Sequence, residues 1–420
     1  MFRLPDTTRK VLGCLILCGA LSSALPPPAG AQTRRARQRR AQTPAARPSP
    51  SPTPVAVPRL APSQSPPSVV INTDEPPPPP RVRPTPTPRP TPEPTPPPDD
   101  EEDVVRVTSN LVVVPVSVTD SAGEAVTGLK LADFRLQEEG RAQELAAVGD
   151  AEQVPLDIAL VFDVSSSVTK NFEFQKQSAA GFLKQVLKPI DRAAIFTIAE
   201  RPQMAQPLAS GADALAGLAK LRAAEKATGT AFYDTVMAAA KYLGANAPER
   251  NRRVILVITD GEDNFSDDVR DATVAALNRV NKSDAERADE EKLLAVAQST
   301  TAPHRRALQK LVREVQRADA VFYSINPSGP GLRLNVISQR AQDNMQQVAE
   351  TTGGNSFVPA RLEDLDSVFR RIAAELRAQY LLQYLSNAAA PPGKFLRIKV
   401  TAPARPDLRI RARQGYYKKG

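Results

Sequence analysis

The sequence predicts an α/β fold with a doubly wound, mainly parallel sheet, and a small β-domain built from the N- and C-terminal flanks of that fold. Strands and helices alternate between residues 155 and 385, and the apolar runs LDIALVFD and RRVILVITD are typical of parallel strands buried on both faces. Near the C-terminus, apolar and basic residues alternate instead, as they do in half-buried antiparallel strands.

The first 31 residues have the features of an export signal. Three basic residues precede an apolar run of 15 residues, and a small-residue cleavage site follows at Ala29-Gly30-Ala31. The run is shorter than the roughly 20 residues that a membrane-spanning helix needs, so we expect no transmembrane segment once the signal is removed. Both cysteines, Cys14 and Cys18, lie in the signal. The mature protein is therefore expected to lack thiols and to lie in the periplasm or outside the cell.

Residues 32–103 are expected to form a disordered, basic, proline-rich linker. Of the 41 prolines in the chain, 26 lie between Pro26 and Pro98. Proline at this density favours an extended polyproline II conformation, so the segment is interpreted as a spacer. In a second interpretation, the five arginines within residues 34–40 contact anionic polymers or lipid headgroups of the envelope, as polybasic segments do.

The formal charge of +9 is confined to the N-terminal part of the chain. Residues 1–98 contain 13 basic and four acidic residues, whereas residues 99–420 contain 42 of each. The foldable part therefore lacks the basic surface that is typical of nucleic-acid-binding proteins. We expect no nucleic-acid partner.

Residues 104–153 and 387–420 are predicted to form one β-domain together. The first segment contains strand-like runs, a turn at Asp120–Gly123 and a hairpin around Glu139-Gly140. Units of this size bury too little surface to be stable alone. The second segment contains the alternating runs KFLRIKVTA and DLRIRARQGYY. We therefore expect both ends of the chain to share this domain and to clasp the α/β domain of residues 154–386.

The α/β domain is predicted element by element from its apolar patterns. The expected strands are 155–163, 192–199, 201–210 (an edge strand), 252–260, 318–327 and 356–359. The expected helices are 174–187, 212–221, 231–244 and 362–385. A charged, helix-prone insertion covers about 269–306. It either forms part of a partner-binding surface or is a solvated extension without a role.

Polar side chains gather where three of these elements begin or end. Asp163 ends the first strand and is followed by the serines Ser165–Ser167. Thr230 lies at the start of a predicted helix, and Asp260 ends another strand. Ligand sites in such sheets lie at the carboxyl ends of parallel strands. Three loops at one edge are therefore expected to bring carboxylates and hydroxyls together.

This pattern, D-x-S-x-S followed by a threonine and then T-D-G, resembles the von Willebrand factor type A (VWA) domain and its metal-ion-dependent adhesion site (MIDAS), over about residues 155–385. The flanking VSVTDSAGEAVTGLKLADF and RQGYY resemble those of bacterial secreted VWFA-related proteins, common in Acidobacteria. The resemblance implies that the aspartates act largely through metal-bound waters, and that an Asp or Glu of a protein partner completes the coordination. It implies five metal ligands: Asp163, Ser165, Ser167, Thr230 and Asp260.

The chemistry of these side chains supports the same assignment independently. Hydroxyls are neutral hard-oxygen ligands, which suits Mg²⁺, with Mn²⁺ or Ca²⁺ as alternatives. In the competing interpretation, the serines cap a helix and the aspartates end their strands by chance. Ser166, between the two ligand serines, is expected to point away from the ion.

Other polar residues are assigned lesser roles. Asp234 is expected to be structural, and Glu262 and Asp263 are candidates for the rim of the site. No site residue is an evident general base, and His304, the only histidine, lies in the polar run TTAPHRR. We therefore expect no enzymatic activity.

The sequence as a whole predicts an exported VWA protein that mediates metal-dependent protein binding or adhesion, in the cell envelope or outside the cell. The alternative is a structural envelope component whose basic, proline-rich tail does the binding.

Overall fold

The computed structural model describes residues 110–165, 171–225, 228–283, 289–330 and 335–419, all within one compact unit. The predicted signal and linker, with Cys14, Cys18 and the arginines of 34–40, lie outside the described residues, as do Ser166 and Ser167. Within the described part, no helix combines the length and apolar content that a membrane crossing requires.

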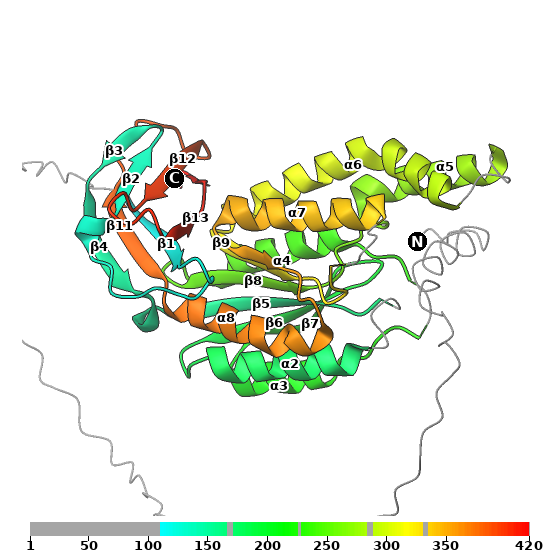
Figure 1. Cartoon of the computed structure of the whole chain (residues 1–420), viewed down its shortest axis with the longest axis horizontal. Helices are drawn as coiled ribbons and strands as arrows, with labels where there is room; N and C mark the ends of the chain where they lie inside the picture. Colours follow the sequence, from blue (N-terminus) through cyan, green and yellow to red (C-terminus); the bar gives the residue numbers. More distant parts are fainter. Residues whose placement is uncertain (1–109, 166–170, 226–227, 284–288, 331–334, 420) are drawn as a thin grey trace, which may run out of the picture. The chain divides into compact units, whose positions relative to one another are not determined.

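A six-stranded sheet forms the centre of the α/β domain, in the order β10-β9-β8-β5-β6-β7 (Figure 1). Its neighbouring strands are parallel except β7, which runs antiparallel to β6 at one edge. The predicted fold class and edge strand are confirmed, and Pro207 suits an edge because it donates no ladder hydrogen bond. The strands are β5 (Leu156–Asp163), β6 (Arg192–Ile198), β7 (Gln203–Ala209), β8 (Arg252–Ile258), β9 (Ala320–Ile325) and β10 (Asn355–Phe357).

Helices cover both faces of this sheet (Figure 1). Along β5, Ile158, Leu160 and Phe162 pack into one hydrophobic layer, while Ala159 and Val161 pack into the other. Burial on both faces explains why the strand reads as a continuous apolar run. The first layer contains α2 (Phe172–Val186), α3 (Gly211–Ala219) and α8 (Leu365–Arg377), and the second contains α4 (Phe232–Asn246), α6 (Asp289–Arg317) and α7 (Val336–Thr352).

The predicted insertion forms a helical hairpin of α5 (Asp267–Ser283) and α6. The 29-residue α6 passes through Pro303 and continues to Arg317, so the insertion and the helix that covers the sheet are one element. The far part of the hairpin has its own small core, formed by Ala276, Leu277, Val280 and Val296. Figure 1 shows this part extending beyond the ends of α4 and α7.

The β-domain consists of two four-stranded sheets, β13-β1-β11-β4 and β14-β12-β2-β3. Strand β1 pairs with β13, and β2 pairs with β12, so strands from both flanks share each sheet, as predicted. The hairpin around Glu139-Gly140 joins β2 and β3, also as predicted. The strands are β1 (Leu111–Thr119), β2 (Arg135–Glu138), β3 (Arg141–Gln143), β4 (Leu145–Asp150), β11 (Tyr380–Leu385), β12 (Phe395–Thr401), β13 (Arg409–Ala412) and β14 (Gly415–Tyr417). Short 3₁₀ helices are η1 (Leu131–Asp133), η2 (Ala151–Gln153) and η4 (Leu362–Asp364).

The prediction of a single helix over residues 362–385 is wrong for the last third of that range. Helix α8 ends at Arg377, and Tyr380–Leu385 forms β11 between β1 and β4, although the sequence assigned these residues to the α/β domain. Tyr380, Leu382 and Tyr384 alternate into the core of the β-domain. This tertiary packing outweighs the modest helix propensity of the segment.

A buried polar network joins the two domains. The Tyr323 hydroxyl of β9 donates to Glu375 Oε1 at 2.6 Å, and Arg411 of β13 pairs with Glu375 Oε2 at 2.5 Å. Arg413 pairs with Asp319 and also donates to the carbonyl of Val113. Arg411 and Arg413 of the β-domain thus pair with Glu375 and Asp319 of the α/β domain, and breaking either pair would leave a charged group without its counter-charge.

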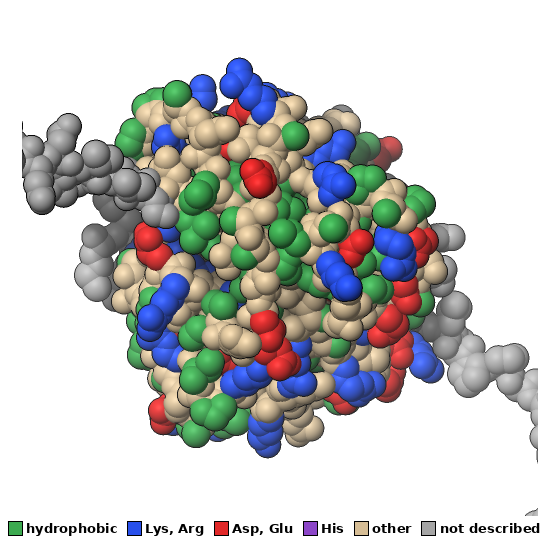
Figure 2. Space-filling model, turned by 90° about the vertical axis from the view of Figure 1, so that its left-hand side faces the viewer, with side chains coloured by type: hydrophobic (Ala, Val, Ile, Leu, Met, Phe, Trp, Pro, Cys, Tyr) green, Lys and Arg blue, Asp and Glu red, His purple; other side chains and the backbone are tan. Residues whose placement is uncertain are grey.

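The β-domain carries some exposed apolar side chains. Leu111 lies opposite Leu385 on adjacent strands, and both are exposed, as is Val113. Figure 2 views the molecule from the left-hand side of Figure 1 and shows hydrophobic side chains interspersed with basic and acidic ones.

Candidate metal site

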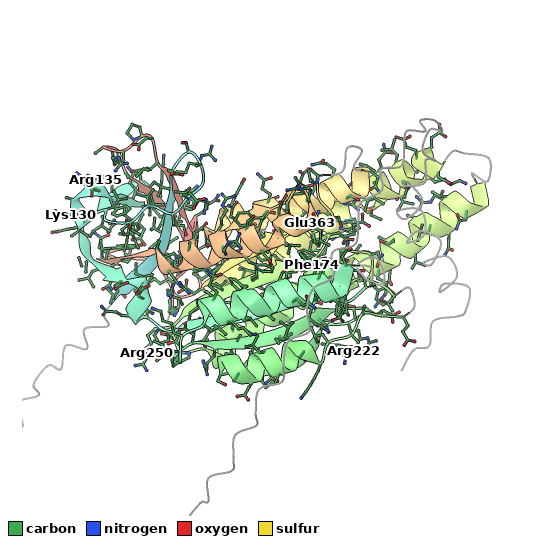
Figure 3. The ribbon with its side chains drawn as sticks, turned by 60° about the horizontal axis from the view of Figure 1, so that its bottom comes forward. Lys130, Arg135, Phe174, Arg222, Arg250 and Glu363 are labelled. Carbon is green, nitrogen blue, oxygen red and sulfur yellow. The ribbon has the colours of Figure 1, made fainter. Side chains whose placement is uncertain are left out.

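The carboxyl ends of β5, β6 and β8 lie at one edge of the central sheet. Asp163 is in register with Ile198, and Phe162 with Ile258. The chain after α3 returns to this edge, where Ala224 N–H donates to the carbonyl of Val164 at 2.8 Å. Figure 3 accordingly shows Arg222 at this end of the sheet and Arg250, before β8, at the other. Three loops therefore meet where the sequence predicted them.

Asp163 is fully buried at the end of β5. Its Oδ1 accepts the Ser165 N–H at 2.8 Å, and its Oδ2 accepts the Thr259 hydroxyl at 2.6 Å. Burial raises the pKa of Asp163, against the effect of these hydrogen bonds. Among the described residues, no basic side chain forms an ion pair with it. A buried carboxylate without a counter-charge is unfavourable, and a bound cation would supply that charge.

Thr230 is held by the loop that follows β8. Its N–H donates to Asn264 Oδ1 at 2.9 Å, and its carbonyl accepts the N–H groups of Asn264 and Phe265, both at 3.1 Å. Gly229 lies directly under the Phe265 ring, where an added Cβ would come within 2.3 Å of a ring carbon. The glycine therefore allows the two loops to approach closely.

Asp260 lies in a tight turn that also requires glycine. Its Oδ1 accepts the Glu262 N–H at 3.3 Å, and Thr259 Oγ1 accepts the Gly261 N–H at 3.0 Å. Gly261 has a φ of +79°, and an added Cβ would lie 2.6 Å from the Cε atom of Met345. Backbone conformation and lack of space both exclude a side chain at this position.

The structure brings four of the five predicted ligands to one edge: Asp163, Ser165, Thr230 and Asp260. Ser167 lies outside the described residues. Two residues to which the sequence assigned no role connect the loops: Thr259, the threonine of the T-D-G motif, contacts the β5 loop, and Asn264 contacts Thr230. The ligand role of the predicted residues stays a prediction.

The donor set fits a hard divalent cation. Carboxylate and hydroxyl oxygens meet here, and Mg²⁺ prefers oxygen ligands while keeping several waters. Within the described residues, no group of three or more His, Cys, Asp or Glu side chains could hold a metal. An ion at this edge would therefore depend on the hydroxyls and on water.

Asp263 is a structural acid rather than part of the rim. It is buried, and its Oδ2 accepts the Tyr233 N–H at 2.8 Å and the Ser266 hydroxyl at 2.6 Å, which fixes the start of α4. Burial raises its pKa to about 6. Asp234 accepts the Asp267 N–H at 2.9 Å and so contacts the start of α5, in the structural role that was expected.

His304, which lies in the polar run TTAPHRR, is buried in α6. Its Nε2 lies 3.0 Å from Arg340 Nη2, and its Nδ1 lies 3.0 Å from the Tyr233 hydroxyl. Because arginine can only donate, Nε2 must accept, and the imidazole is neutral with its proton on Nδ1. Asn344 also donates to the Tyr233 hydroxyl, at 2.7 Å. The network joins α4, α6 and α7 beside the candidate site.

This network predicts a pH-dependent stability. Burial and Arg340 lower the pKa of His304 to about 3, whereas an unfolded histidine titrates near pH 6.5. Between these values only the unfolded chain binds the proton, so the free energy of unfolding should fall by up to about 1.4 kcal/mol per pH unit as pH decreases. Above about pH 6.5 the contribution is constant.

Urea unfolding of the natural protein and of His304→Gln, measured from pH 4 to 8, checks this expectation. Asp263, which accepts the Tyr233 N–H, acts in the opposite direction below about pH 6, because its raised pKa makes the folded protein bind the extra proton, but it is common to both proteins. The natural protein should lose stability more steeply below pH 6.5 than the variant. Parallel pH profiles would contradict a buried neutral histidine.

The fold and the edge described above define an α/β domain with a hydroxyl-rich site at its strand ends. Residues 158–262 match the family model of the von Willebrand factor type A domain. The chain therefore contains a VWA domain, as its motifs indicated. No curated protein sequence matches the chain.

Solved structures show distant likeness to the chain. Proximal thread matrix protein 1 from the mussel byssus, with a zinc-occupied MIDAS motif, is 16% identical with a TM-score of 0.35, over 57% of this chain and 49% of that chain. The vWF domain of the pilus tip protein Mfa5 from Porphyromonas gingivalis is 13% identical with a TM-score of 0.36, over 52% and 94%. BatB from Bacteroides thetaiotaomicron is 14% identical with a TM-score of 0.31, over 52% and 97%. This chain thus spans about half the length of the mussel protein.

Proposed function

We propose that this protein is exported and binds another protein through a divalent metal ion held by its VWA domain. The observation that carries the proposal is a fully buried carboxylate, Asp163, at an edge where three loops are joined by hydrogen bonds. Ser165, Ser167 and Thr230 would supply hydroxyl ligands, and Asp163 and Asp260 would orient metal-bound waters. Mg²⁺ is the proposed ion, with Mn²⁺ or Ca²⁺ as alternatives.

The proposed partner presents an Asp or Glu side chain to the ion. Neutral hydroxyl ligands do not cancel the charge of a divalent cation, so a bound ion would stay attractive to a carboxylate. The residues around the site favour binding over catalysis. The acid Asp263 and the imidazole of His304 are both buried and engaged in structural hydrogen bonds. We therefore propose a binding protein, not an enzyme.

Export is part of the proposal because it determines where the partner is found. The N-terminal signal and the cleavage site before Gln32 support a mature protein in the periplasm or outside the cell. A partner is therefore expected among envelope or extracellular proteins. The rival proposal, a structural envelope component, assigns binding to the basic residues of 34–40 instead.

A pulldown from envelope extract separates these proposals. Mature protein should capture its partner with Mg²⁺ present, release it with a chelator, and capture it again when Mg²⁺ is restored. Deletion of residues 32–103 should leave this capture intact, whereas Asp163→Ala should abolish it. Capture that resists the chelator and is lost only with residues 32–103 would support the rival.

A further inference from the structure

Thr259, the residue before Asp260, is fully buried between the ends of β8 and β5. Its Oγ1 accepts the Gly261 N–H at 3.0 Å, and its hydroxyl donates to Asp163 Oδ2 at 2.6 Å. Because a hydroxyl has a single proton, the donor from Gly261 directs that proton toward the carboxylate. The chain of hydrogen bonds therefore runs in one direction, from the Gly261 backbone through Thr259 to Asp163.

This row of hydrogen bonds fixes the orientation of the Asp163 carboxylate. The Ser165 N–H donates to Oδ1 and the Thr259 hydroxyl donates to Oδ2, so the two oxygens are held from two different loops, and the Ser165 hydroxyl also hydrogen-bonds to the carboxylate. Because donors on two loops hold its two oxygens, the carboxylate is fixed in one rotational position. Without the Thr259 hydroxyl, the buried Oδ2 atom of Asp163 would lose this hydrogen-bond donor, which is unfavourable.

We propose that Thr259 is a positioning residue of the metal site: it does not bind the ion, but it orients the carboxylate of Asp163 across the two strands. The inference rests on the proposed metal-binding function and deepens it. Outer residues that orient metal ligands typically contribute about 10–100-fold to metal affinity. Loss of the Thr259 hydroxyl should therefore weaken metal binding without removing any ligand.

The test is calorimetric titration of Mn²⁺ into the mature protein and its variants. Thr259→Val keeps the shape of the side chain but removes the hydroxyl, and it should weaken Mn²⁺ binding by about 10–100-fold. Thr259→Ser keeps the hydroxyl and should bind Mn²⁺ as the natural protein does. If Thr259→Val does not fold, Thr259→Ala removes the same hydroxyl from a smaller side chain.

Thr352→Val is the matched control. Thr352 is also buried, and its hydroxyl also both donates, to the Val348 carbonyl at 2.9 Å, and accepts, from Phe322 N–H at 3.1 Å. It ends α7, at the opposite edge of the sheet from the metal loops. This variant should lose stability in urea but keep its Mn²⁺ affinity. Equal weakening by Thr352→Val would overturn the proposal, because the effect would then be general loosening.

The outcomes also separate this inference from the proposed function. Natural affinity in Thr259→Val, together with lost binding in Asp163→Ala, would overturn the positioning role and leave the metal site standing. Absence of Mn²⁺ binding by the natural protein would instead overturn the metal site itself. Weak binding by Thr259→Val, restored in Thr259→Ser, supports the proposal.

Discussion

Removal of residues 395–417 is expected to make the protein aggregate. The deletion removes β12, β13 and β14, so that β1 loses its partner along Val116–Thr119 and β2 along Arg135–Glu138. It also removes apolar side chains that pack in the β-domain core: Ile398, Val400, Leu408, Ile410, Ala412 and Tyr416. Unpaired strand edges and an opened core favour pairing with other chains.

Light scattering and limited proteolysis check this expectation. The shortened protein should form large particles, and protease should release the segment that holds β1 to β4 faster than in the natural protein. The α/β domain should resist digestion longer than that segment in both, because its own layers are complete, although the deletion also removes Arg411 and Arg413, the partners of Glu375 and Asp319. A protein that lacks only residues 418–420 retains every described strand and serves as the control. Equal release from the shortened and natural proteins would contradict the shared sheets.

Asp163→Ala is expected to abolish detectable metal binding while the protein remains folded. The substitution removes the carboxylate that would orient metal-bound water, and support of this kind is worth about 10–100-fold in affinity. It also removes a buried charge that lacks a counter-charge, which offsets part of the cost of leaving the Ser165 and Thr259 donors without an acceptor, so the protein should remain folded. Calorimetric titration with Mg²⁺ and Mn²⁺ measures the loss, and circular dichroism verifies the fold.

Two further substitutions test whether the loops act on one ion. Thr230→Ala and Asp260→Ala, from the other two loops, should weaken binding as Asp163→Ala does. Ser166→Ala should be nearly silent, since that serine lies between the proposed ligands, and it is the matched control. Undiminished metal affinity in Asp163→Ala would mean that the polar residues end their strands by chance.

The central sheet could be predicted because its strands are buried on both faces. LDIALVFD and RRVILVITD contain apolar side chains for both hydrophobic layers, a pattern that few other environments produce. The positions of Asp163 and Asp260 followed from the same strands, because the carboxyl ends of parallel strands meet at one edge. The family motif identified these residues independently.

Strand β11 could not be predicted because its conformation depends on distant partners. The segment from Leu362 to Leu385 reads as one amphipathic helix, yet Tyr380–Leu385 pairs with β1 and β4, more than 200 residues earlier. The role of Thr259, the first residue of the T-D-G motif, was not predicted for a similar reason. Its contact with Asp163 joins positions 96 residues apart and depends on the register of β5 with β8.

The burial of His304 could have been recognised from helical spacing. Val296, Thr300, His304, Ala307 and Leu311 recur at intervals of three or four residues and are all buried on one side of α6. The charged residues between them suggested a solvated segment, but those residues occupy the other side of the helix. A periodicity of 3.6 is a better guide here than average polarity.

The most direct test of the metal site is the anomalous difference map of a crystal of this protein soaked in Mn²⁺. The account predicts one peak at the edge of the central sheet, beside the hydroxyls of Ser165 and Thr230, with waters between the ion and the carboxylates of Asp163 and Asp260. A map without a peak at this edge, at Mn²⁺ concentrations that saturate binding in solution, would contradict it.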